Sequence, residues 1–156
     1  MRKTRIYLDT SVVSMFDDSE RGIITKKFFE IIEREPDNYE IIVSPVLEEE
    51  ILITPEPEKK VKIYQRLELL PKINIGKNDE AENLAWIYVI EDVLTDTHID
   101  DLRHIAYAVT SRCDYVVSWN MKHLSNVRTI NRVNNYNKNN NYPIVMITPP
   151  TIFLGE

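Results

Sequence analysis

Carboxylates at three separated points of the sequence could together bind a divalent cation. Asp9 follows an apolar run at 4–8, Glu50 lies within 45–52, and Asp101 lies near the start of 97–120. Several crowded carboxylates cannot all stay ionised unless cations accompany them. Their oxygen atoms favour hard cations such as Mg²⁺ or Mn²⁺. Such ions activate water and stabilise charge on a phosphoryl group, so these residues predict phosphoryl transfer or phosphodiester hydrolysis.

The segment 97–120, THIDDLRHIAYAVTSRCDYVVSWN, should place Asp101 at the start of a helix. Its apolar residues recur at spacings of three and four, at Ile99, Leu102, Ile105, Ala106 and Val109. Thr97 is predicted to cap this helix, with Asp100 bonding back to it in a capping box. That leaves Asp101 free for chemistry. His104 is expected on the polar, solvated side of the helix.

A second helix should present Glu50 toward the same place. Ser44 and Pro45 are typical of a helix start, with serine as the cap and proline in the first turn. At about 100° per residue, an inward arc is defined by Val46, Leu47 and Ile51. Glu50 falls inside this arc, whereas Glu48 and Glu49 fall outside it.

The overall pattern predicts an α/β fold of three layers, α/β/α. Strand-like runs near 4–8, 40–43, 73–75, 115–118 and 144–148 alternate with helical patterns, which is typical of a mostly parallel, five-stranded sheet. The carboxyl ends of its strands would share one edge, with Asp9, Ser11 and Asn120 at it. The asparagine-rich run 134–141 is expected to be an exposed loop, and Pro149–Pro150 to end regular structure. One domain is predicted over 1–150, with a tail at 151–156.

Composition narrows the class of protein. The chain has 156 residues, 28% of them charged, a net charge of −6 and one cysteine, which excludes a disulfide framework. It has no run of about 20 apolar residues and no secretory h-region, so a cytoplasmic location is the default expectation. Residues 79–101 hold eight acids and no Lys or Arg, whereas 115–155 hold no acid. The basic residues of that later part are expected to contact a polyanion, chiefly through Lys122 and Arg128, with Arg132 near them.

Four segments in this order resemble the signature segments of PIN-domain nucleases: YLDTSVVS, SPVLEEEI, DDLRHIAYA and DYVVSWNMKHL. That family includes the toxin halves of many toxin–antitoxin pairs. The resemblance implies a PIN-like fold and a metal-dependent endoribonuclease specific for single-stranded RNA. It also implies a small antitoxin protein and a second copy of the chain as partners.

The resemblance also implies roles for individual residues. Asp9, Glu50 and Asp101 would bind Mg²⁺ or Mn²⁺, and Ser11 matches a small polar residue beside the first aspartate. Asn120 stands where the family often has a fourth acid, which puts a second metal ion in doubt. The catalytic set is therefore Asp9, Glu50, Asp101 and Asn120, and the substrate-binding set is Ser11, Ser118, Lys122 and Arg128.

Two other classes of function fit parts of the same pattern. A phosphohydrolase of the haloacid dehalogenase type would use Asp9 as nucleophile, but that family has a second aspartate two residues later, where this chain has Ser11. A catalytically weak RNA-binding protein with a PIN-like fold is the other alternative, and Asn120 is the feature that favours it.

Overall fold

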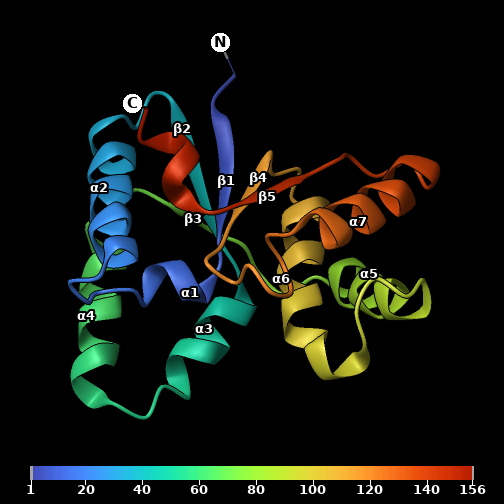
Figure 1. Cartoon of the computed structure of the whole chain (residues 1–156), viewed down its shortest axis with the longest axis horizontal. Helices are drawn as coiled ribbons and strands as arrows, with labels where there is room; N and C mark the ends of the chain where they lie inside the picture. Colours follow the sequence, from blue (N-terminus) through green and yellow to red (C-terminus); the bar gives the residue numbers. More distant parts are fainter. Residues whose placement is uncertain (1, 156) are drawn as a thin grey trace.

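A parallel sheet forms the middle layer of the computed structural model, which describes residues 2–155 (Figure 1). Its strands within that range are β1 (Thr4–Leu8), β2 (Tyr39–Val43), β3 (Ile73–Asn74), β4 (Tyr115–Val117) and β5 (Met146–Thr148). They lie in the order β3-β2-β1-β4-β5, and each neighbouring pair is parallel. The predicted five-stranded α/β fold is confirmed, with every strand parallel rather than most of them.

Helices cover both faces of this sheet. On one side lie α1 (Thr10–Val13), α2 (Glu20–Arg34) and α4 (Pro57–Glu68), and on the other lie α5 (Asp79–Ile90), α6 (Ile99–Thr110) and α7 (Val127–Asn139) (Figure 1). The remaining helix, α3 (Pro45–Leu52), follows β2 directly. No helix within residues 2–155 has the length and apolarity needed to cross a bilayer.

The central strand supplies side chains to two separate hydrophobic cores. Successive residues of a strand point to opposite faces, so Ile6 and Leu8 pack beneath α2 while Tyr7 packs beneath α6. Helix α3 contributes to both cores, through Val46 on one side and Leu47 and Ile51 on the other. All three residues of the predicted inward arc are therefore buried, and Glu48 and Glu49 are exposed as expected.

The prediction of an exposed loop at 134–141 is wrong, because helix α7 continues to Asn139. The asparagines that suggested a loop make specific contacts instead. Asn134 pairs with both backbone groups of Val145, at 2.7 and 2.9 Å, and the buried Asn137 accepts a hydrogen bond of 2.6 Å from the Tyr88 hydroxyl. Together with Val133, these residues give the helix a buried face that composition alone conceals.

The cap predicted at Thr97 is also wrong. A short 3-10 turn, η1 (Asp96–His98), precedes α6, and His98 occupies the cap position without a side-chain hydrogen bond to the helix. Asp100 does not bond back to Thr97; its carboxylate lies 3.1 Å from the Arg103 guanidinium. Regular structure also extends beyond Pro149–Pro150, since η2 (Pro150–Phe153) packs Phe153 against the rings of Phe28, Tyr39 and Tyr115.

Candidate metal centre

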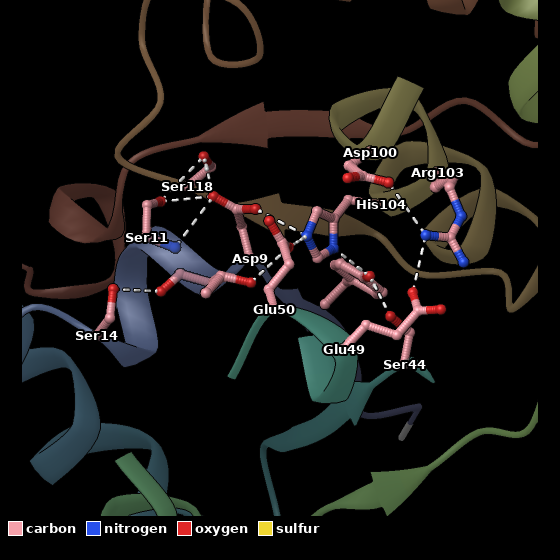
Figure 2. Close-up of polar contacts among 12 residues, drawn as sticks. Asp9, Ser11, Ser14, Ser44, Glu49, Glu50, Asp100, Arg103, His104 and Ser118 are labelled. Carbon is pink, nitrogen blue, oxygen red and sulfur yellow. Dashed lines mark hydrogen bonds and ion pairs between the residues drawn. The ribbon is translucent and has the colours of Figure 1, made fainter. Parts of the chain in front are cut away.

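Asp9 lies at the carboxyl end of β1 with its side chain 7% exposed, and neighbouring groups fix its orientation (Figure 2). One oxygen, Oδ2, accepts hydrogen bonds from the hydroxyls of Ser11 at 2.5 Å and Ser118 at 2.8 Å. The backbone N–H of Ser11 approaches the same oxygen at 3.4 Å, so Asp9 also caps α1. The second oxygen, Oδ1, faces the ring of His104, whose Nε2 is 3.3 Å away.

Glu50 reaches the same place from α3. Its Oε1 accepts a hydrogen bond of 2.7 Å from the Thr10 hydroxyl and pairs closely with His104 Nε2. The side chain is 31% exposed, so Glu50 forms the solvent-facing wall of the cluster. Glu50 therefore lies where the apolar arc of α3 predicts it, directed toward the end of β1.

His104 is the residue that sequence reasoning missed. It was expected on the solvated side of α6, but it is buried at 1% exposure between Asp9 and Glu50. Its other ring nitrogen, Nδ1, lies 2.5 Å from the hydroxyl of Tyr7, which in turn lies 2.5 Å from Ser44 Oγ. The signal in the sequence was its spacing: His104 is three residues from Asp101, so the two share one face of the helix.

Asp101 is close to this cluster but makes a looser set of contacts. Its carboxylate, 24% exposed, lies 3.7 Å from Nδ1 of His98. Burial, followed by the negative charge of Asp9, raises the pKa of Asp101 to about 6. Burial and a neighbouring negative charge both disfavour the charged form of this carboxyl.

The pKa shifts of Glu50 and His104 show that the two side chains stabilise each other's charged forms. Burial raises the pKa of Glu50, but the hydrogen bond and charge of His104 outweigh this effect and lower it. Burial lowers the pKa of His104, but the charges of Asp9 and Glu50 raise it above its ordinary value. An imidazolium at His104 thus compensates two of the carboxylates, and Asp101 is left without an equivalent partner.

The residues fit a divalent cation. Asp9, Glu50 and His104 each offer a ligand atom within 4.8 Å of the other two. The ring of His104 would coordinate through a deprotonated Nε2 while Nδ1–H donates to Tyr7, an orientation typical of metal-bound histidines. Asp101, predicted as a ligand, lies outside this tight group but close enough for Asp9 to raise its pKa.

Asn120 and Ser118 lie immediately beside the cluster, after β4. Ser118 Oγ donates to Asp9 and accepts from the backbone N–H of Asn120 at 2.9 Å. The side-chain oxygen of Asn120 accepts the N–H of His123 at 3.1 Å, so it shapes the turn that follows. The structure does not test the substrate-binding role predicted for Ser11 and Ser118; it shows both hydroxyls bonded to Asp9.

Lys122, in this turn, and Arg128, at the start of α7, lie on the wall of a cavity of ≈ 240 Å³. The cavity is separate from the carboxylates, but His98 lines it and also approaches Asp101. Asp114, by contrast, precedes β4 at the opposite edge of the sheet. It pairs there with Arg2 at 2.8 Å and with the backbone of Arg5, in a structural role.

The comparison with solved structures finds a similar fold over most of the chain. No family model and no curated protein matches the sequence. Among solved structures, the chain is similar to one in "Crystal structure of VapBC2 from Rickettsia felis bound to a DNA fragment from their promoter", with a TM-score of 0.57 and 12% identity over 92% of this chain and 97% of that chain. This likeness in structure shows the fold alone, and it confirms the PIN-like α/β fold that the four sequence segments predicted.

Proposed function

We propose that this chain is a metal-dependent endoribonuclease that hydrolyses phosphodiester bonds in single-stranded RNA. The observation that supports this proposal most is the meeting of Asp9, Glu50 and Asp101 with His104 at the carboxyl edge of a parallel sheet. Ligands bind at this edge in open α/β sheets. The PIN-like fold and the likeness to a VapBC2 structure favour a nuclease over other uses of the same donor atoms.

The chain's own residues have distinct tasks in this proposal. Asp9, Glu50 and Asp101 would hold Mg²⁺ or Mn²⁺, with Nε2 of His104 as a further ligand, and the bound ion would supply activation of water and stabilisation of charge on the phosphoryl group. Ser11 and Ser118 fix the Asp9 carboxylate through Oδ2, which leaves Oδ1 directed toward His104. Thr10 holds Glu50, and Tyr7 with Ser44 holds the ring of His104. Lys122 and Arg128 attract the RNA backbone and offset its repulsion by the carboxylates.

RNA cleavage is the direct test. A single-stranded RNA incubated with the protein and Mn²⁺ or Mg²⁺ is expected to give internal fragments, and EDTA should abolish them. The Asp9→Asn variant should lose most of this activity, because it removes a charged ligand from the proposed metal site. Asp114→Asn, which alters a carboxylate at the opposite edge, is the matched control and should cleave normally.

The same assay separates the alternatives. A haloacid-dehalogenase-like phosphohydrolase would release phosphate from a small phosphate ester and form a phosphoaspartate at Asp9. This is disfavoured because Asp9 Oδ2 already accepts three donors and Oδ1 faces His104. A catalytically weak RNA-binding protein would bind RNA and leave it intact with either metal. That alternative is favoured because the residue at position 120 is an asparagine that stabilises a turn, where a nuclease of this family often has a fourth acid.

We further propose that the chain acts as the toxin of a toxin–antitoxin pair. The similar solved structure is of VapBC2 with a DNA fragment from the promoter, and the sequence segments resemble those of toxin-type PIN domains. Growth arrest on expression of the wild type but not of Asp9→Asn would support this role. Light scattering of the purified chain would test the predicted homodimer.

A further inference from the structure

The cavity beside α7 has the composition of an anion site. Its wall carries three cationic side chains, Lys122, Arg128 and Arg132, against one acid, Asp92. Arg132 donates to the backbone oxygen of Asp92 at 2.5 Å, which anchors the guanidinium in the wall. Within residues 2–155, Lys122 and Arg128 form no ion pair with any carboxylate, so their charges face the cavity and its surroundings without compensation.

A close, tilted pair of imidazole rings lines the same cavity. The ring centroids of His98 and His123 are 3.9 Å apart, with an angle of 33° between the ring planes. Both side chains are half-buried, so solvent reaches the two rings in part. Flat aromatic surfaces beside cationic side chains are the combination that proteins use to bind single-stranded nucleic acids.

Two connections join the cavity to the carboxylate cluster. On one wall, His98 Nδ1 lies 3.7 Å from Asp101. On the other, the His123 N–H donates to Asn120, whose own N–H donates to Ser118, and Ser118 holds Asp9. These contacts place the cavity beside the carboxylate cluster.

We propose that this cavity is a nucleotide subsite for single-stranded RNA next to the scissile bond. The phosphate contacts Lys122 and Arg128, and the base stacks on the His98–His123 pair. A volume of ≈ 240 Å³ is just below the usual range for ligand pockets of roughly 300–1,000 Å³, which suits one nucleotide rather than a longer segment. This inference rests on the proposed nuclease function and extends it by naming where a neighbouring nucleotide binds.

The first experiment measures the affinity of a short unpaired RNA as a function of salt, with Ca²⁺ in place of Mn²⁺ to prevent cleavage. Each phosphate contact contributes about 0.7 to the salt slope for single strands, so Lys122→Ala/Arg128→Ala should lower its magnitude by about 1.4. The control is Lys59→Ala/Lys138→Ala, which removes the same charge from exposed positions on α4 and at the end of α7. Equal slopes for the two double variants would overturn the proposal.

The second experiment tests the base contact. Removing the base at one position of the RNA should weaken binding to the wild type by about tenfold, the range expected for one stacked base. His123→Ala should bind intact and abasic RNA equally, and His123→Phe, which restores a flat ring, should recover the difference. If His123→Ala discriminates against the abasic RNA as strongly as the wild type does, the base does not stack there and the proposal fails.

The outcomes distinguish this subsite from the nuclease proposal. If the wild type fails to cleave RNA with Mn²⁺ but shows the slope and abasic differences, the subsite proposal stands and the nuclease proposal fails. If the wild type cleaves RNA but the variants behave like their controls, the nuclease proposal stands and the subsite proposal fails. Normal Mn²⁺-induced stabilisation of each variant verifies that its carboxylate cluster is intact.

Discussion

The ionised carboxylate of Asp101 opposes folding. Its pKa of about 6 lies above the value near 3.9 of an unfolded aspartate, because burial and Asp9 disfavour the charged form. The folded chain therefore binds more protons at this group than the unfolded chain does. Stability from this group is present at low pH and is lost as pH rises through the interval from about 4 to about 6. At pH 7 the cost is at most about 3 kcal/mol.

The first prediction follows from the loss of stability that ionised Asp101 causes as pH rises. In EDTA, Asp101→Asn should be more stable than the wild type at pH 7, by about 1–2 kcal/mol after relaxation, and the difference should shrink as pH falls toward 4. Urea unfolding at several pH values measures both quantities. Asp100→Asn is the control, since that carboxylate is 60% exposed and should change stability by less than about 0.5 kcal/mol. A destabilised Asp101→Asn variant at pH 7 would contradict the charge balance described for the cluster.

Tyr7 gives the second prediction at this scale. Its hydroxyl is buried and joins His104 Nδ1 to Ser44 Oγ, so Tyr7→Phe leaves two buried polar groups without their partner. The expected loss is about 1–3 kcal/mol of unfolding free energy. Because the hydroxyl also orients the ring of His104, Mn²⁺ affinity should fall by roughly 10–100-fold.

Urea unfolding and Mn²⁺ titration measure the two effects of Tyr7→Phe separately. Tyr39→Phe is a suitable control, because the Tyr39 hydroxyl makes no side-chain hydrogen bond among residues 2–155. A loss of stability with unchanged Mn²⁺ affinity would mean that the Ser44–Tyr7–His104 chain supports the fold alone.

At the scale of elements, the sequence predicts what depends on local pattern. The apolar runs locate all five strands, and the phase of α3 places Glu50 toward the end of β1. The start of α6 and the burial of His104 depend instead on tertiary contacts. Composition suggests that a histidine on the polar side is solvated, but Tyr7 lies on the neighbouring strand and supplies a partner that no local window contains. The same limit explains α7, whose asparagines become helical because distant groups bond to them.

The third prediction tests that account of α7. Asn134 supplies both an acceptor and a donor to the backbone of Val145, just before β5. Asn134→Ala should therefore cost about 2 kcal/mol of unfolding free energy, since it leaves both groups of Val145 without their partner. Asn135→Ala, one position along on the exposed side, should change stability by less than about 0.5 kcal/mol. Equal effects in a denaturant titration would mean that Asn134 does not attach α7 to the sheet.

At the scale of the whole molecule, the candidate metal ligands come from both cores. Asp9 follows β1 in the middle of the sheet, Glu50 is on α3, which packs into both cores, and Asp101 is on α6. A cation bound among them would reduce the repulsion between carboxylates that come from both cores. Metal binding should therefore stabilise the chain as one cooperative unit rather than a single loop.

Mn²⁺ at about 100 times its dissociation constant is expected to add about 2.7 kcal/mol to the unfolding free energy. For a chain of this size, that corresponds to an increase in Tm of about 5–10 °C. Asp9→Asn should lose this increase, because it removes a charged ligand from the proposed metal site. Asp114→Asn should keep it, because its carboxylate pairs with Arg2 at the other edge of the sheet. Calorimetry with and without Mn²⁺ measures these shifts. An increase in Asp9→Asn equal to that of the wild type would place the bound ion elsewhere on this acidic chain.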